Sequence, residues 1–282
     1  MKRGWIAGLV VGLFAATQVA SAGPVILAGH DADDHGFESV YASLFDSLLS
    51  NVTNGGSGIL SIGANVGGDA ADWISSVAGL MTVPQPVTFI NDAAISSTSF
   101  SGFAILHVPS DIDDTSGGIT GAENALLTAR AGAVASFVNG GGGLFGLTQG
   151  LLVDQYGYIT GGGGLGAITT LRLPPSGLLP SGNPYNDVTA TLAGNAVGID
   201  NTNLDGCCWH NVYTAFPSFL DILAVANAPA IGDEAFNEEA SVIGGQSVIL
   251  RPIPTIPEPG SMLLFGFGGL GAGLIRRRRR SA

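Results

Sequence analysis

The first half of the chain alternates short apolar runs with longer segments of helical spacing, and this pattern constrains the fold most. Val25–Ala28 and Ile59–Ile62 are almost wholly apolar, as in strands that are buried on both faces. Residues 37–49 and 70–80 instead repeat apolar residues three and four positions apart, which is typical of helices. Strands that alternate with helices predict a mainly parallel sheet with helices on both faces.

Further elements are predicted along the rest of the chain. A single long helix is expected over 120–139, because Thr120 and Glu123 have the spacing of a capping box and Gly140 follows as a stop. A loop rich in Ser and Thr is expected between the strands at Val87–Ile90 and 103–108. The remaining predicted strands are 144–147, 188–192, 212–216 and 220–226, and then a strand pair over 241–250 hinged at Gly244-Gly245.

The C-terminus has three parts in a fixed order. Pro257, Glu258 and Pro259 form a stretch that cannot lie inside a helix, because proline lacks the N–H donor. Residues 261–275 are apolar and would span about 22 Å as a helix, which is less than the ~30 Å hydrocarbon core of a bilayer. A run of arginines ends the segment and is expected to stay on the cytoplasmic side. The run consists of Arg276, Arg277, Arg278, Arg279 and Arg280.

This tail resembles the PEP-CTERM sorting signal of Gram-negative bacteria. The resemblance implies recognition by an exosortase, a membrane-embedded peptidase-like enzyme, and delivery to the cell surface or to an exopolysaccharide matrix. It implies as partners the exosortase, the secretion machinery, the inner membrane during transit and exopolysaccharide. An ordinary C-terminal membrane anchor is the alternative, and cleavage of the tail is left open.

The N-terminus predicts a secretory signal peptide. Lys2 and Arg3 form a basic start, an apolar stretch follows, and Ala20-Ser21-Ala22 supplies small residues before a cleavage site. We expect the mature chain to begin at Gly23. The chain therefore divides into a signal peptide (1–22), an exported α/β domain (23–252), a Pro-rich linker (253–260), a transmembrane helix (261–275) and a basic cytoplasmic tail (276–282).

The exported part is strongly acidic. Between residues 23 and 256 the only basic residues are Arg130, Arg172 and Arg251, against 21 Asp and Glu, so the net charge is −18. Such an acidic surface repels nucleic acid, so we expect no nucleic acid among the partners of this protein. The two cysteines, Cys207 and Cys208, are adjacent. A strained vicinal disulfide, an intermolecular bond and two reduced thiols all stay open.

Residues 141–150, Gly-Gly-Gly-Leu-Phe-Gly-Leu-Thr-Gln-Gly, follow a predicted helix that ends Ser-Phe-Val-Asn. This segment resembles the strand and elbow of the class I glutamine amidotransferase-like superfamily, and His107-Val-Pro-Ser110 and the segment from His210 fit the same order. The resemblance implies a flavodoxin-like sheet over about residues 24–250. It also implies a cysteine nucleophile at the elbow, where this chain has Thr148 and Gln149. Because a thiolate is needed for that chemistry, we expect a non-catalytic, ligand-binding domain.

Two loops rich in His and Asp follow predicted strands. In open parallel sheets, ligands bind beyond the carboxyl ends of the strands, so both loops are expected at one edge. Together they predict a site for a divalent cation, with Ca²⁺ favoured by the carboxylates and Zn²⁺ by the histidines. The alternatives are an extracellular hydrolase that uses these loops, a structural matrix protein bridged by Ca²⁺, and simple solvated turns and N-caps. The candidate residues are His30, Asp31, Asp33, Asp34, His35, His107, Asp111, Asp113 and Asp114.

Overall fold

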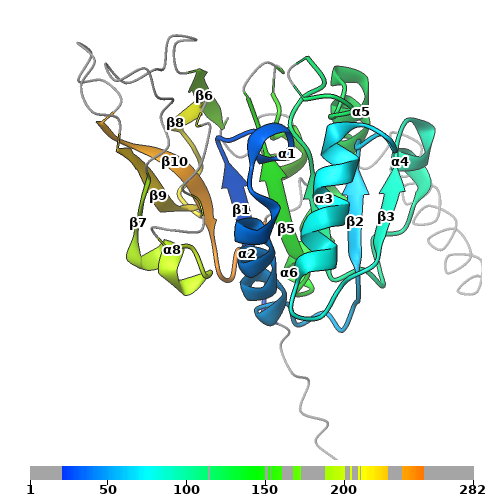
Figure 1. The fold of residues 1–282 in the computed structure, drawn as a ribbon, viewed down its shortest axis with the longest axis horizontal. Coiled ribbons are helices and arrows are strands. Elements are labelled where there is room, and N and C mark those ends of the chain that lie inside the picture. The colour runs from blue at the N-terminus through cyan, green and yellow to red at the C-terminus, as the bar shows by residue number, and fades with distance from the viewer. Residues whose placement is uncertain are drawn as a thin grey trace, which may run out of the picture.

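The structure is a computed structural model, and it describes residues 21–113, 115–149, 152, 154–160, 168–172, 188–200, 204, 209, 211–227 and 237–250. Within these residues the chain has a mixed α/β fold around a ten-stranded sheet (Figure 1). The main path of the sheet runs in the order β3-β2-β4-β5-β1-β10-β8-β6. Strand β9 also pairs with β10, and β7 pairs with β9.

Five parallel strands form one half of this sheet, as the apolar runs predict. Every residue of β1, β2, β4 and β5 is buried, which explains why these segments are almost wholly apolar. The strands are β1 (Val25–Ala28), β2 (Ile59–Ile62), β3 (Val87–Ile90), β4 (Ile105–Val108) and β5 (Gly143–Leu147).

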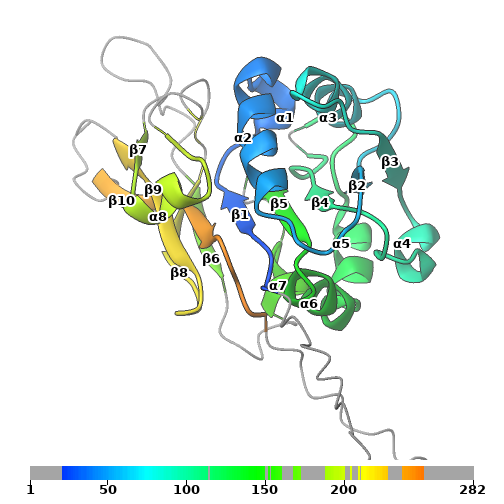
Figure 2. The same cartoon turned by 90° about the horizontal axis from the view of Figure 1, so that it is seen from below.

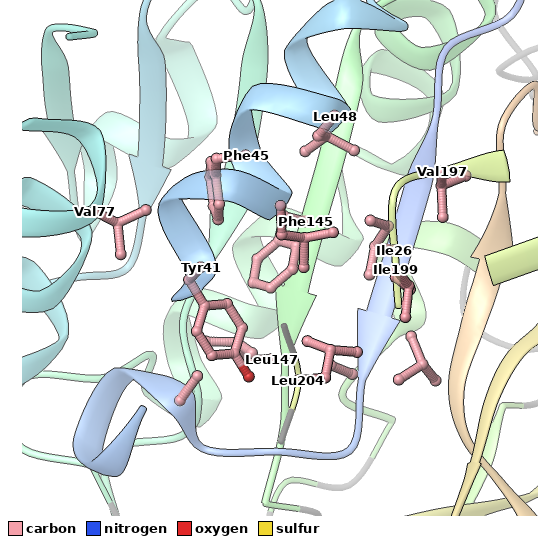
Figure 3. Packing of buried hydrophobic residues seen from close by; sticks show 14 of the residues in the cluster. Ile26, Tyr41, Phe45, Leu48, Val77, Phe145, Leu147, Val197, Ile199 and Leu204 are labelled. Carbon is pink, nitrogen blue, oxygen red and sulfur yellow. The ribbon is translucent and has the colours of Figure 1, made fainter. Parts of the chain in front are cut away.

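Helices cover both faces of the parallel half, as Figure 2 shows. One layer consists of α1 (Ala32–His35), α2 (Glu38–Ser50) and α3 (Asp69–Leu80), and the other contains α4 (Ala93–Ser97), α5 (Gly121–Thr128), α6 (Ala131–Asn139) and α7 (Gly157–Thr160). Alternate side chains of each strand enter opposite cores. Ile26 and Phe145 pack with Phe45 beneath α2 (Figure 3), whereas Leu27 and Leu144 pack on the other face.

The other half of the sheet is antiparallel, so the predicted mainly parallel sheet is only half right. This half contains β6 (Thr169–Arg172), β7 (Val188–Ala190), β8 (Asn211–Ala215), β9 (Asp221–Asn227) and β10 (Asn237–Gly245), with the short helix α8 (Leu192–Ala196). It joins the parallel half where β10 pairs with β1. Gly244 permits this pairing, because it has a φ of 153° and a Cβ there would lie 1.9 Å from the Val25 carbonyl oxygen.

The strand order also differs from the flavodoxin-like order that the superfamily resemblance implies. In that order the first strand lies between the second and the third. Here β1 lies between β5 and β10 and β2 lies between β3 and β4, so β4-β5 is the one neighbouring pair of parallel strands that the two orders share. In this chain β1 is flanked by parallel β5 on one edge and by antiparallel β10 on the other.

The predicted helix over 120–139 is two helices. Its capping box at Thr120 and Glu123 is confirmed, and Gly140 follows the last residue of α6. The break lies at Arg130, whose guanidinium donates hydrogen bonds to the carbonyls of Ile95 and Thr98. A tertiary contact therefore accompanies the break that helical spacing alone did not reveal.

Three smaller predictions are wrong or shifted. The predicted loop between β3 and β4 contains α4. The predicted strand pair over 241–250 is the single strand β10, after which no strand follows up to Leu250, the end of this described segment. The predicted strand over 188–192 ends at Ala190, and α8 begins at Leu192.

Across the described part of the chain, no helix combines the length and apolar character that crossing a membrane requires. The predicted transmembrane helix at 261–275 lies outside these residues, as do residues 1–20 of the predicted signal peptide. Both remain predictions.

Candidate functional site

The polar residues that follow β1, β4 and β5 meet at the carboxyl edge of the parallel half. These strands are neighbours in the order β4-β5-β1, so the residues just beyond them are brought together although up to 118 positions separate them. The sequence predicted that both His/Asp loops lie at this edge. The physical reason is that the carboxyl ends of parallel strands meet at the same edge of a sheet.

The segment after β1, which was expected to be a loop, forms the short helix α1, and two of its carboxylates tie the three strand ends together: Asp31 at the N-cap and Asp33 within the helix. Gln149 Nε2 donates to Asp31 Oδ2 at 2.5 Å. Asp33 accepts the backbone N–H of Ser110 at 2.8 Å and the Ser110 hydroxyl at 2.5 Å. All four residues are buried. The network holds the loop after β1 against the ends of β4 and β5.

Burial makes Asp33 an unusual acid. Its pKa is raised from 3.8 to about 7, chiefly by the loss of hydration and also by the negative charge of Asp31, and the two hydrogen bonds from Ser110 oppose the change. The group therefore exchanges its proton near neutral pH, which is the range useful for acid–base chemistry.

His30 belongs to this edge through aromatic contacts. Its Nδ1 lies 3.3 Å from the Tyr41 hydroxyl, and its ring meets that of Trp209 edge-on at 4.9 Å. Burial and the charges of Asp31 and Asp33 raise the pKa of Tyr41, so the phenol stays neutral. Figure 3 shows the side chain of Tyr41, a residue of α2, beside Phe145 of β5.

His107 is not part of a loop. It lies within β4, where its Nδ1 is 2.9 Å from the Ser61 hydroxyl and its ring stacks on Phe145. Burial lowers its pKa to about 3, so the imidazole is neutral. Its Nε2 has no hydrogen-bond partner among the described residues. The structure thus places His107 in the core between α2, α3 and the sheet rather than on the surface of a binding loop.

The acidic residues after β4 turn back on their own loop. Asp111 Oδ1 accepts the backbone N–H of Asp113, and Asp113 is exposed. Asp34 is half-buried, whereas Asp114 and the side chain of His35 lie outside the described residues. No three His, Cys, Asp or Glu side chains form a group able to hold a metal ion within the described part of the chain.

The elbow after β5 holds its threonine in an internal hydrogen bond. The Thr148 hydroxyl donates to Gln155 Oε1, and Gln155 Nε2 donates to the Leu147 carbonyl at 3.0 Å. Both Thr148 and Gln155 are buried. The sequence did not single out Gln155, because a lone glutamine in a loop carries no pattern that would distinguish it.

Three buried tyrosines behind this elbow were also not predicted. The hydroxyls of Tyr156 and Tyr213 are 2.7 Å apart, and the ring of Tyr158 packs edge-on against that of Tyr156. Burial raises the pKa of each phenol, so all three are neutral hydrogen-bonding groups. They join β8 of the antiparallel half to the segment after β5.

Comparison with known proteins identifies the tail. Residues 255–280 match the PEP-CTERM protein-sorting motif. The prediction of this sorting signal is confirmed, and it marks an exported protein that is recognised and processed by exosortase. A search of curated proteins found no significant match, and neither did a search of solved structures. The likeness to class I glutamine amidotransferase-like proteins therefore stays a prediction.

The remaining candidate residues lie outside the described part. They are Pro257, Glu258, Pro259 and the arginines at 276–280, together with His210, Cys207 and Cys208.

Proposed function

We propose that this chain is a surface or matrix protein of a Gram-negative bacterium, whose precursor is held at the inner membrane before exosortase acts. The sorting motif at 255–280 carries the proposal. The basic, apolar and small-residue succession in residues 1–22 supports it, because a C-terminal sorting signal is useful only to a chain that is exported. The apolar residues 261–275 would hold the precursor in the bilayer.

The motif itself provides the test. Replacing Pro257, Glu258 and Pro259 together by alanine is expected to abolish delivery to the surface and to leave the chain in the inner-membrane fraction. Pro252→Ala with Pro254→Ala is the matched control, since both prolines precede the matched residues. Unchanged surface delivery of the triple variant, measured by fractionation and surface protease treatment, would contradict the proposal.

We also propose that the exported domain binds a ligand and does not catalyse a reaction. Thr148 occupies the place of the nucleophile, and its hydroxyl donates to an amide oxygen, which is not a base that could activate it. The destination favours exopolysaccharide as the ligand class. Co-sedimentation of the purified chain with exopolysaccharide tests this, and an absence of binding at low and high salt would contradict it.

A hydrolase that uses the carboxyl-edge acids is the second candidate function, and the pKa of Asp33 near 7 favours it. One carboxyl in its acid form beside a second carboxyl suits general acid–base catalysis. Ca²⁺ or Zn²⁺ would be its cofactor only if residues outside the described part of the chain supply further metal ligands beside His30, Asp31 and Asp33. Elemental analysis of the full chain, compared with His30→Ala, tests for the metal. Loss of polysaccharide cleavage in Asp33→Asn tests for the acid.

A further inference from the structure

The two ends of the folded part are bound to the same place, the C-terminal end of α6. The backbone N–H of Gly23 donates to the Val138 carbonyl at 2.7 Å. At the other end, Asn139 clamps Leu250 with one hydrogen bond to its carbonyl at 2.6 Å and one from its N–H at 2.9 Å. Val248 N–H also donates to the Gly23 carbonyl, so the two ends contact each other.

This meeting point lies at the amino edge of the parallel strands. Gly23 lies two residues before β1, and Gly245 at the end of β10 pairs with Val25, the first residue of β1. Ten residues, 251–260, separate Leu250 from the apolar segment, and they span at most about 35 Å when fully extended.

The loops of this edge carry no charge. We define the amino-edge loops as residues 51–58, 81–86, 98–104, 139–142 and 246–250, which contain no Asp, Glu, Lys or Arg. Two carboxylates border them. Asp46 on α2 accepts hydrogen bonds from the backbone and hydroxyl of Thr82, and Asp221 pairs with Gly244 at the start of β9.

Exposed apolar side chains add to the uncharged character of the amino edge. Val83 is 63% exposed and Ile249 is 66% exposed, and both belong to the amino-edge loops. Leu80 at the end of α3 is 57% exposed and directly precedes one of these loops. The opposite edge holds the acidic loops after β1 and β4. Within the described part of the chain, the charges of the connecting segments are therefore unevenly distributed between the two edges.

We propose that the amino edge of the sheet is the face turned toward the bilayer while the precursor is anchored, with the carboxyl edge and its acidic loops pointing away. This inference rests on the proposed function, since it requires the apolar segment 261–275 to enter the membrane. The amino-edge loops would face the surface of an anionic bilayer, which repels carboxylates and tolerates uncharged loops.

Distance explains why the acidic edge does not prevent this approach. Strands of four or five residues rise about 13–17 Å. That exceeds the Debye length of about 8 Å at physiological ionic strength. Carboxylates at the far edge are therefore largely screened from the lipid headgroups, whereas carboxylates placed on the amino-edge loops would not be.

Two exposed valines on opposite edges allow a matched test. Val83 belongs to the amino-edge loops, and Val66, 78% exposed, follows β2 at the carboxyl edge. The full chain with Cys207→Ser and Cys208→Ser would carry a spin label at either Val83→Cys or Val66→Cys. In vesicles of phosphatidylethanolamine and phosphatidylglycerol, relaxation by nickel-chelating lipid is expected to be several-fold stronger at position 83.

Each outcome has a defined meaning. Equal relaxation at the two positions, or stronger relaxation at 66, in vesicles that the chain floats with overturns the orientation alone. A chain that does not float with vesicles overturns the anchoring step of the proposed function as well. Hydrogen exchange on the unsubstituted chain provides an independent measurement. Vesicles should slow exchange in 81–86 and not in 63–68, and equal protection in both segments would overturn the proposal.

Discussion

The two edges of the parallel half are made by the same strands and are held together in opposite ways. At the carboxyl edge, buried side chains from distant loops bond to each other, as Asp33 does with Ser110 and Asp31 with Gln149. At the amino edge the contacts are made to the backbone, as at Gly244 and where the Asn139 side chain bonds to the backbone of Leu250. We therefore expect the stability of the carboxyl edge to vary with the protonation of Asp33, and the stability of the amino edge to depend on how closely its backbone segments pack.

The largest effect is expected at the amino edge from Gly244→Ala. A Cβ at this position would lie 1.9 Å from the Val25 carbonyl oxygen. The pairing of β10 with β1 would have to open, and the free energy of unfolding should fall by about 3 kcal/mol or more. Chemical denaturation measures this change.

Gly132→Ala on α6 is the control for that substitution, because its added Cβ meets no atom within 4 Å. It should stabilise the protein by up to about 1 kcal/mol. If Gly244→Ala changed the free energy of unfolding as little as Gly132→Ala, the amino edge would not depend on the close approach of β10 to β1.

The second effect concerns the carboxyl edge and pH. Because burial raises the pKa of Asp33 from 3.8 to about 7, the folded state keeps this proton between those values while the unfolded state has lost it. Stability should therefore decrease as pH rises through this window. The contribution of Asp33 between pH 5 and pH 8 is about 3 kcal/mol of lost stability.

Comparing Asp33→Asn with the unsubstituted protein isolates this contribution. His107 acts in the opposite sense. Burial lowers its pKa to about 3, so its contribution to the stability of the protein is lost as pH falls below 6.5. Its effect is common to both proteins and cancels. The variant should gain stability relative to the unsubstituted protein as pH rises, and parallel pH profiles would refute the raised pKa.

A smaller effect is expected when the clamp at the amino edge is removed. Asn139→Ala deletes both hydrogen bonds to the backbone of Leu250, which is fully buried. The expected loss is about 2 kcal/mol, together with faster hydrogen exchange at Leu250. Asn195→Ala, on the exposed face of α8, serves as the control and should change stability by less than about 0.5 kcal/mol.

The smallest effect is expected at the elbow. Thr148→Val removes the hydroxyl that donates to Gln155 and should lower stability by about 1 kcal/mol, whereas Thr148→Ser keeps the donor. Surface delivery and ligand binding should not change in either variant. An enzymatic activity that disappears in Thr148→Val and persists in Thr148→Ser would contradict the non-catalytic proposal.

The parts of the fold that could be predicted from the sequence are those that depend on the pattern of neighbouring residues. The buried strands β1, β2 and β5 follow from apolar runs, and the start of α5 follows from the capping box at Thr120. The break at Arg130 was not predicted, and neither was the antiparallel pairing of β7, β8 and β9, although strands were expected near their positions. Both depend on contacts with segments far along the chain, and hydrophobic period does not record such contacts.

The candidate site divides in the same way. The placement of Asp31 and Asp33 beyond β1 could be predicted, because strand ends point to one edge. The sequence placed His107 within the strand expected over 103–108 but did not show which way its side chain points, because a histidine near the end of an apolar run has the same local pattern in either case. The choice was made by Ser61 and Phe145 on neighbouring strands, which meet His107 only in the assembled sheet.

The sequence by itself determined the destination of this protein, since the motif at 255–280 is read as a linear segment and needs no fold. It also determined the acidic charge and the first five strands. Only the tertiary structure decided where that charge lies, and which residues hold the two ends of the domain at the uncharged edge. The physical reason is that charge and periodicity are properties of neighbouring residues, whereas the pairing of β10 with β1 joins positions more than 200 residues apart.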